Sequence, residues 1–146
     1  MDAINATHRK FGHPATVIRD YAHWTVQLRP EQVTLGSLVL VCKDPARSFA
    51  AITPPAFAEL GTVTADAERV LKDAWGWSKI NYLMLMMTDP DVHFHVFPRY
   101  DRTLSFAGLA FPDRGWPRQP DMANPVRPEP AVLEAIAGHL RERWPR

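Results

Sequence analysis

The sequence predicts an α+β fold with a mainly antiparallel sheet, one long helix and a C-terminal helix. Four stretches rich in apolar, β-branched or aromatic residues are bounded by proline, glycine or polar turns, as is typical of strands. Residues 54–75 instead place their apolar side chains at helical spacing. The last two predicted strands are joined by a short connection, which favours antiparallel neighbours.

The length of the chain, 146 residues, predicts one domain over residues 1–146 that can bury a core without disulfides. We expect its core over about residues 22–100, and a proline-rich segment with a final helix over residues 101–146. Hydrophobic residues make up 46% of the chain, an ordinary share for a globular protein.

Charge and cysteine content exclude several classes of protein. The formal net charge is +1 and no lysine or arginine block stands out, which argues against a nucleic-acid duplex or a membrane as partner. Cys42 is the only cysteine, so an internal disulfide and a cysteine-based zinc site are excluded. The N-terminal residues lack the apolar segment of a secretory signal, and the longest apolar run is too short to span a bilayer. We therefore expect a soluble, cytoplasmic protein.

The first part of the chain predicts two strands. Residues 1–20 are mixed and polar and allow either an arm or a short helix, with solvated histidines. Residues 24–28 alternate as a strand does, and residues 35–42 form a nearly continuous apolar run, which predicts a central strand buried on both faces. Lys43 follows in a turn, where it is either a solvated cation or a phosphate contact.

The long helix is expected over residues 54–75, and Gly76 stands where such a helix ends. The third predicted strand covers residues 80–87, and its Asn81 has either a structural role or a ligand-binding one. Six prolines between residues 112 and 130 indicate irregular chain, preceded by a short edge strand at residues 104–106. A final amphipathic helix is expected from residue 129 to residue 144.

The chemistry is concentrated in the fourth predicted strand, over residues 92–97, which we expect Pro98 to end. A tight turn separates it from the third strand. Residues two apart on a strand share a face and lie roughly 6.6–7 Å apart along it. Asp91, His93 and His95 therefore point to one side, opposite the apolar residues Val92, Phe94 and Val96.

Three interpretations of this carboxylate and its two imidazoles compete. They could bind a metal ion, but no further ligand is evidently placed to complete the shell. They could be two satisfied histidines on a sheet surface. The third interpretation is nucleophilic catalysis on phosphorus, with one imidazole as nucleophile and a second group that binds the phosphoryl oxygens. His93, His95 and Thr88 supply those groups.

Residues 88–99, TDPDVHFHVFPR, resemble the signature of the histidine triad superfamily, which runs roughly T-V-P-H-x-H-x-H-V-x-P-R. Residues 35–45, LGSLVLVCKDP, are similar to its G-H-x-L-V-x-P-K segment. The fragile-histidine-triad branch, which hydrolyses dinucleoside polyphosphates such as diadenosine polyphosphate, looks nearest. With the helix between the two segments, the resemblance covers roughly residues 22–100.

The resemblance implies that His93 is the nucleophile, that His95 contacts the phosphate and that Thr88 hydrogen-bonds to it. Asn81 matches an asparagine on the preceding strand of the family. The resemblance also implies a homodimer whose sheets join across the two subunits, nucleotide binding, and neither a cofactor nor a structural metal.

Two departures from the family pattern concern the substrate more than the chemistry. The first triad histidine is Asp91 here, although the backbone carbonyl that orients the nucleophile is retained. Met86 and Met87 stand where the family has a glycine-rich loop. Asp91, Lys43 and Arg99 are further candidates for binding the substrate, the two cations by neutralising the charge of its phosphate. The resulting expectation is a nucleotide hydrolase or transferase that acts on a phosphoanhydride or phosphoramidate. The alternative is a nucleotide-binding or interaction module that has lost turnover.

Overall fold

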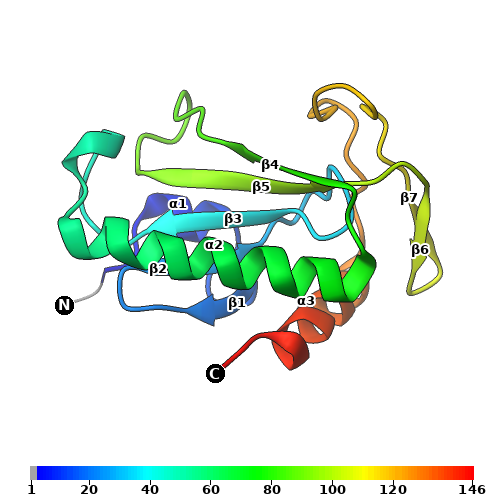
Figure 1. Cartoon of the computed structure of the whole chain (residues 1–146), viewed down its shortest axis with the longest axis horizontal. Coiled ribbons are helices and arrows are strands. Elements are labelled where there is room, and N and C mark those ends of the chain that lie inside the picture. Colours follow the sequence, from blue (N-terminus) through cyan, green and yellow to red (C-terminus); the bar gives the residue numbers. More distant parts are fainter. Residues whose placement is uncertain (1–2) are drawn as a thin grey trace.

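A five-stranded sheet forms the centre of the protein, of which a computed structural model describes residues 3–146 (Figure 1). The sheet has the order β1-β2-β3-β5-β4, and its neighbouring strands are antiparallel. These strands are β1 (Val17–Asp20), β2 (Trp24–Leu28), β3 (Leu38–Cys42), β4 (Lys79–Leu83) and β5 (His93–Arg99). The other elements are α1 (Ala6–Lys10), a 3-10 turn (Phe49–Ala51), α2 (Pro54–Trp75), α3 (Pro130–Arg143), β6 (Leu104–Phe106) and β7 (Leu109–Phe111). The predicted α+β fold with its mainly antiparallel sheet is therefore confirmed.

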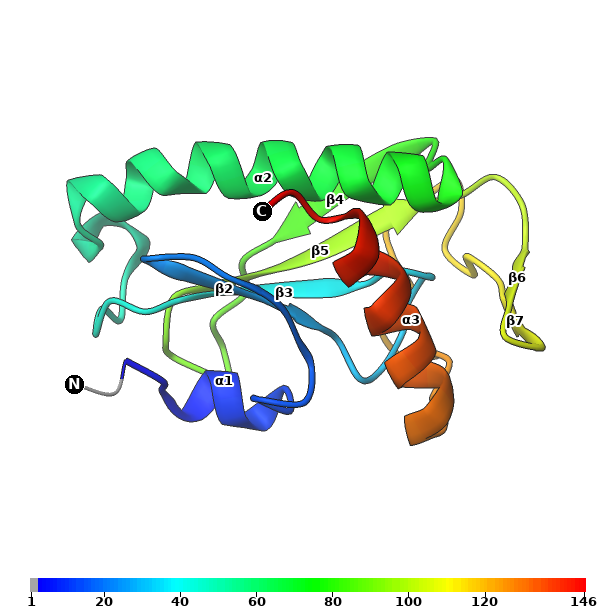
Figure 2. The same ribbon diagram turned by 90° about the horizontal axis from the view of Figure 1, so that it is seen from below.

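The sheet is covered on both faces, by α2 on one side and by α1 on the other (Figure 2). The main core lies on the α2 side and contains alternate residues of the strands, among them Trp24, Val26, Leu38, Leu40 and Val96. On the other side Phe11 packs with Val39 and Val41 in a smaller cluster. Since β3 lies between β2 and β5 and is buried along its whole length, its predicted central place is confirmed.

Two predicted strands are shorter than expected. β3 begins at Leu38 because residues 34–37 form a turn in which Gly36 has a φ of +91°. A Cβ at Gly36 would lie 2.8 Å from Leu71 of α2, so the turn also needs the close approach that glycine allows. β4 ends at Leu83, and residues 84–92 form a loop in place of the expected tight turn. Met86 has a φ of +50° in this loop, which is incompatible with a strand.

β5 runs past the proline that was expected to end it. Pro98 is paired with Ile80 of β4, and the strand continues to Arg99. Proline is tolerated here because pairing with β3 has already ended at Val96, so no amide donor is needed on that side.

The helices match their predicted ranges closely. α2 covers residues 54–75 and ends at Gly76, whose φ of +62° is the left-handed C-cap conformation. α3 differs by one residue at each end from the prediction. Within residues 3–146, no helix is long and apolar enough to cross a membrane.

One C-terminal detail differs from the expectation: β6 pairs with β7 in a separate hairpin and is not an edge of the main sheet. On α3, the ring of His139 stacks on Trp75 at 5.1 Å between centroids and contacts Phe106 edge-on.

Residues 6–20 contain the helix α1 and the edge strand β1, and α1 covers the sheet face that carries the two histidines of β5 (Figure 2). Asn5 caps α1 by accepting hydrogen bonds from the backbone amides of Thr7 and His8, at 3.0 and 3.1 Å. His8 is fully buried, and its Nε2 lies 3.2 Å from the hydroxyl of Thr25. The expectation that the histidines of this segment are solvated is therefore wrong for His8.

Candidate active site

A cavity of about 220 Å³ opens where α1, the end of β2 and the loop before β5 meet. The predicted alternation of β5 is confirmed, because His93 and His95 face this cavity while Val92 and Val96 lie in the core on the α2 side. The full lining comprises Lys10, Phe11, Arg29, Glu31, Leu85, Met86, Met87, Thr88, Asp89, His93 and His95.

His93 is held in one orientation by the backbone. Its Nδ1 lies 2.6 Å from the carbonyl oxygen of Asp91, and the residue is only 2% exposed. A carbonyl only accepts hydrogen bonds, so Nδ1 carries the proton and Nε2 of the neutral ring keeps its lone pair. The carbonyl contact expected at this position is therefore present, and Nε2 is the nitrogen available as a nucleophile.

His95 is held in the complementary tautomer by Arg29. The Nε of Arg29 lies 3.3 Å from Nδ1 of His95. Since arginine only donates, Nδ1 is the acceptor and the proton of the neutral imidazole is on Nε2. Burial, followed by the nearby Arg29 charge, lowers the pKa of His95 to about 4. His95 is therefore a neutral hydrogen-bond donor near pH 7.

The two imidazoles are adjacent, with 5.2 Å between their ring centroids. The ring of Phe11 lies on the same side, with its centroid 6.2 Å from that of His93 and 5.6 Å from that of His95. Together they place a lone pair and an N–H donor in one small, partly apolar cavity.

Asp91 does not line the cavity. Thr7 donates a hydrogen bond of 2.9 Å to its Oδ2, and Nε of Arg47 lies 3.6 Å from its Oδ1. The carboxylate is thus paired with a hydroxyl of α1 and with a cation, which limits the repulsion of a phosphate that this aspartate would otherwise cause.

The loop before β5 forms one wall of the cavity. Thr88 is exposed at this wall, and Lys10 of α1 forms an ion pair of 2.5 Å with Asp89 across the opening. Met87 is 89% exposed and Leu85 is 54% exposed, so the loop presents an apolar rim where the family has glycines.

Lys43 and Arg99 lie away from the cavity. Nζ of Lys43 binds Asp20 at 2.6 Å and the carbonyl of Tyr21 at 2.5 Å. Arg99 forms a buried, bidentate ion pair with Asp113, at 2.8 and 2.9 Å. Both cations are therefore neutralised by carboxylates far from them in sequence.

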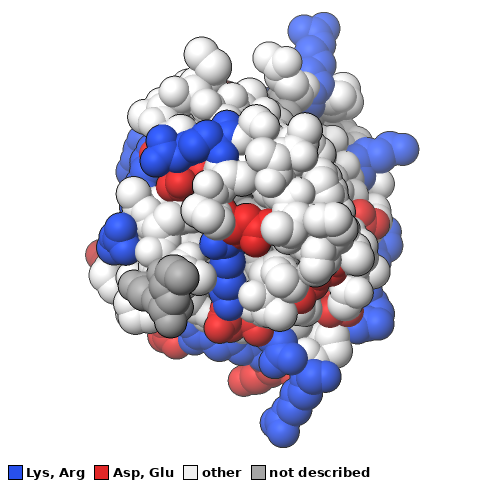
Figure 3. Space-filling view, turned by 90° about the vertical axis from the view of Figure 1, so that its left-hand side faces the viewer, with Lys and Arg blue, Asp and Glu red and all other residues white. Residues whose placement is uncertain are grey.

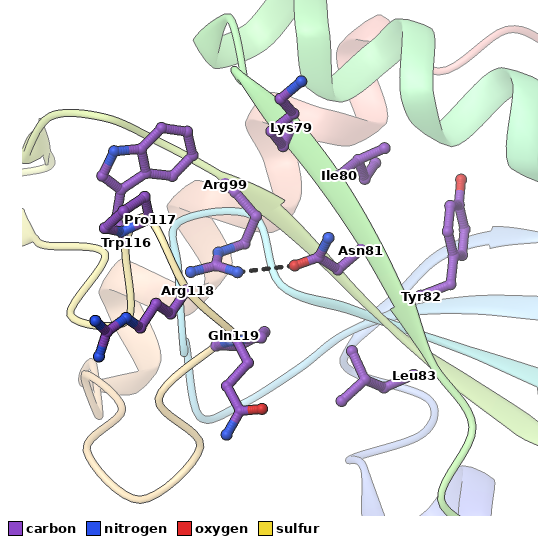
Figure 4. A pocket seen from close by; sticks show the side chains of 11 residues that line it. Lys79, Ile80, Asn81, Tyr82, Leu83, Arg99, Trp116, Pro117, Arg118 and Gln119 are labelled. Atoms are coloured by element: carbon purple, nitrogen blue, oxygen red, sulfur yellow. Dashed lines mark hydrogen bonds between the residues drawn. The ribbon is translucent and has the colours of Figure 1, made fainter.

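Asn81 also lies outside the cavity, on the same sheet face but closer to the end of β5. Its Oδ1 accepts a hydrogen bond of 2.8 Å from Nη1 of Arg99, as Figure 4 shows. This pair lines a larger groove of about 890 Å³ between β4 and residues 116–120. The groove contains neither histidine of β5, so the smaller cavity is the better candidate for chemistry.

Arg29, Lys10 and Phe11 line the cavity although their positions in the sequence do not single them out. Arg29 follows a predicted strand, close to where the family holds a ribose, but its type does not match that role. Lys10 and Phe11 lie in the segment whose structure the pattern leaves open. A hydrophobic residue beside a basic one in that segment is too common a signal to identify them.

Charges of both signs are intermixed on the side of the molecule where the N-terminal residues and the start of α2 lie (Figure 3).

Within the described chain, no three histidine, cysteine or carboxylate side chains converge as a metal site would require.

Comparison with known proteins finds similarity in structure only. No family model matches the chain, and no curated protein matches it. A histidine triad protein from Bradyrhizobium japonicum has a TM-score of 0.74 at 19% identity, covering 97% of this chain and 96% of that one. A histidine triad protein from Sinorhizobium meliloti has a TM-score of 0.75 at 20% identity, covering 96% and 95%. A zinc-bound histidine triad family protein from Mycobacterium smegmatis has a TM-score of 0.60 at 18% identity, covering 89% and 84%. At such low identities these likenesses establish the fold alone, and they show that the chain has the fold of the histidine triad proteins.

Proposed function

We propose that the protein is a nucleotide hydrolase or transferase that cleaves a phosphoanhydride or phosphoramidate through a nucleotidyl-His93 intermediate. The observation that carries this proposal is the pair of complementary tautomers. Nε2 of His93 offers a lone pair, and Nε2 of His95 offers a proton for hydrogen bonding, in the same cavity. Nucleophilic catalysis on phosphorus needs these two groups.

In the first step the lone pair of His93 attacks phosphorus, a P–N bond forms, and the bond to the leaving group breaks with its electron pair. The Nδ1 proton stays on the ring and strengthens its hydrogen bond to the Asp91 carbonyl as positive charge develops. In the second step water attacks phosphorus, the P–N bond breaks and its electrons return to Nε2, while the water proton goes to solvent. We assign the binding of the phosphoryl oxygens to His95 and Thr88, both of which line the cavity.

The size of the cavity suits the reacting phosphate and not a whole dinucleotide. Sites for drug-sized ligands usually measure about 300–1,000 Å³, and this cavity measures about 220 Å³. The remainder of a nucleotide would therefore lie along the rim, where Leu85 and Met87 are exposed. Apolar side chains of this kind suit the flat face of a base.

The test is the variant His93→Asn. The side-chain amide of asparagine can still donate to the Asp91 carbonyl, but it has no nucleophilic lone pair. We expect the wild type, mixed briefly with dinucleoside polyphosphates or adenylate amidates, to gain the mass of one nucleotidyl group and to release product. The variant should do neither and should keep its fold by circular dichroism.

Turnover that persists in His93→Asn would refute the covalent mechanism. Nucleotide binding without an adduct or product in the wild type would favour the alternative, a binding module on the same fold. A thermal shift with each nucleotide measures that binding directly.

We further propose that the protein is a homodimer in which β4 meets its copy. β4 is one of the two edge strands of the sheet, and an edge strand presents unpaired backbone groups to a partner. The groove along it is lined partly by apolar side chains, including Ile80, Tyr82 and Leu83. Light scattering should report twice the chain mass, and Leu83→Lys should lower it, because a lysine on the edge opposes pairing. A wild-type monomer at micromolar concentration would refute this proposal.

A further inference from the structure

Arg29 is a buried cation that is influenced by the charge of Glu31 but forms no ion pair within the described residues. Its residue is 9% exposed, and within residues 3–146 no carboxylate lies within ion-pair distance of its guanidinium. The other charges of the cavity are paired, Lys10 with Asp89 and Glu31 with Arg127. A buried charge is costly unless it is compensated, so an anion bound beside Arg29 would be stabilised.

The guanidinium of Arg29 also has N–H donors without an acceptor in the described part of the chain. Its Nε contacts His95 and its Nη1 donates 2.9 Å to the carbonyl of Glu31, while Nη2 makes no hydrogen bond within the described part of the chain. Nη2 is accessible to solvent and not sealed in the interior, and Arg29 lines the cavity. The two N–H groups of Nη2 are therefore available to an anion that binds beside Arg29.

The contact with Arg29 also restricts what His95 can do with its proton. A histidine acts as a general acid when its ring is doubly protonated, because it then gives up one proton and becomes neutral. Nδ1 of His95 faces a guanidinium, which cannot accept a proton and opposes a second positive charge. If the neutral ring lost its Nε2 proton it would become an anion. His95 therefore stabilises charge by hydrogen bonding and does not protonate the leaving group.

This restriction distinguishes the two kinds of substrate in the proposed function. A phosphate that leaves a phosphoanhydride is stable as an anion, because the second pKa of a phosphate ester is about 6. An amine that leaves a phosphoramidate must take up a proton as its P–N bond breaks, since its anion is too basic to form in water. The first kind can therefore leave without a proton from His95. The second kind depends on a proton from solvent and should be cleaved more slowly at such a site.

We propose that Arg29 makes this site selective for phosphoanhydrides over phosphoramidates, by holding His95 as a neutral Nε2–H donor and by binding the departing phosphate through Nη2. The inference rests on the proposed function. In the step, the P–N bond to His93 forms, the P–O bond breaks, and its electron pair stays on the departing phosphate oxygen. No proton is transferred, and the guanidinium compensates the new charge. Arg29 is thus a positioning residue for His95 and a contact for the leaving group.

The first test needs no catalysis and no variant. In ¹⁵N-histidine-labelled wild-type protein near neutral pH, two-bond correlations should show Nδ1 of His95 unprotonated and Nε2 protonated, and the opposite pattern for His93. A doubly protonated His95, or one with its proton on Nδ1, would overturn the inference.

The second test compares kcat/KM for a dinucleoside polyphosphate and an adenylate amidate in the wild type, Arg29→Gln and Arg29→Lys. Arg69→Gln is the matched control, because it removes the same charge from an exposed site on α2. The wild type should prefer the anhydride. A hydrogen bond between charged groups typically stabilises by an amount that corresponds to a factor of about 10 to 150, so Arg29→Gln should lose that factor on the anhydride alone.

The remaining outcomes are equally decisive. Arg29→Lys should recover part of the loss, because it restores the charge without the fork of donors. An equal loss on both substrates, or a wild type that prefers the amidate, would overturn the selectivity. If the wild type cleaves neither substrate, the proposed function fails and the selectivity with it. Calorimetry with inorganic pyrophosphate then decides the anion site separately, since weaker binding by Arg29→Gln than by Arg69→Gln would support it and equal affinities would refute it.

Discussion

The buried ion pair of Arg99 and Asp113 tests whether a structural role keeps Arg99 out of the candidate site. The two side chains are 4% and 2% exposed, and two hydrogen bonds of 2.8 and 2.9 Å join them. Asp113 also accepts a hydrogen bond of 3.1 Å from the backbone amide of Tyr100. The substitution Asp113→Asn keeps the shape of the side chain but removes its charge, so Arg99 is left buried and uncompensated.

The expected loss is large, because removal of one partner of a buried ion pair typically costs about 3–5 kcal/mol. In a chain of this size 1 kcal/mol shifts the thermal midpoint by about 2–4 °C, so the midpoint should fall by roughly 6–20 °C. Urea denaturation followed by circular dichroism measures the free energy of unfolding. Asp101→Asn is the control, because the pair of Asp101 with Arg102 is exposed and its loss should cost under about 1 kcal/mol.

A small effect on stability would refute this reasoning. If Asp113→Asn lowers the free energy of unfolding by less than about 1 kcal/mol but weakens nucleotide binding, the pair does not stabilise the fold and Arg99 contributes to binding the substrate. If the variant unfolds early yet binds nucleotide as the wild type does below its midpoint, the structural role is supported.

Two further predictions concern the histidine cavity. Asp91→Asn should leave kcat/KM within about threefold of the wild type, because the backbone carbonyl of Asp91 orients His93 while its carboxylate contacts Thr7. A loss of about 100-fold, or 2.7 kcal/mol, would show that the carboxylate acts in the reaction. Stability should fall as pH is lowered from 6.5 towards 4, because burial lowers the pKa values of His8 and His95 to about 4 from 6.5. The unfolded chain binds protons in this window that the folded protein does not, so each histidine should contribute a slope of up to ~1.4 kcal/mol per pH unit, and its contribution is fully present only above pH 6.5. Urea denaturation across this range should give a shallower slope for His8→Gln and for His95→Gln than for the wild type; identical slopes would contradict the burial argument.

Local patterns in the sequence were sufficient for four strands of the main sheet, for the two long helices and for the direction of the side chains of β5, whereas β1 and β7 were not predicted. Alternation along β5 placed His93 and His95 on one face because successive residues of a strand point to opposite sides. Helical spacing followed by Gly76 predicted both ends of α2, since a helix and its cap depend on neighbouring residues alone. The same locality explains why β4 was predicted too long, because residues 84–87 are apolar as a strand is, although only Met84 and Met86 pack against the core.

The charged residues show what such patterns leave undecided. Lys43 and Arg99 carry the charge that a phosphate site needs, yet Asp20 and Asp113 neutralise them. Arg29, in contrast, reaches His95 across 66 positions of sequence. Nothing in the local sequence distinguishes these three cations, because the partner of each comes from a different element.

By itself, therefore, the sequence determined which residues share a strand face, where the two long helices lie and which two imidazoles stand side by side. These properties follow from backbone periodicity over a few residues. Only the tertiary structure decided which nitrogen of each imidazole carries the proton, which cations remain available and that α1 covers the site. These properties depend on distances between residues remote in sequence, which are set when the sheet, the helices and the loops pack together.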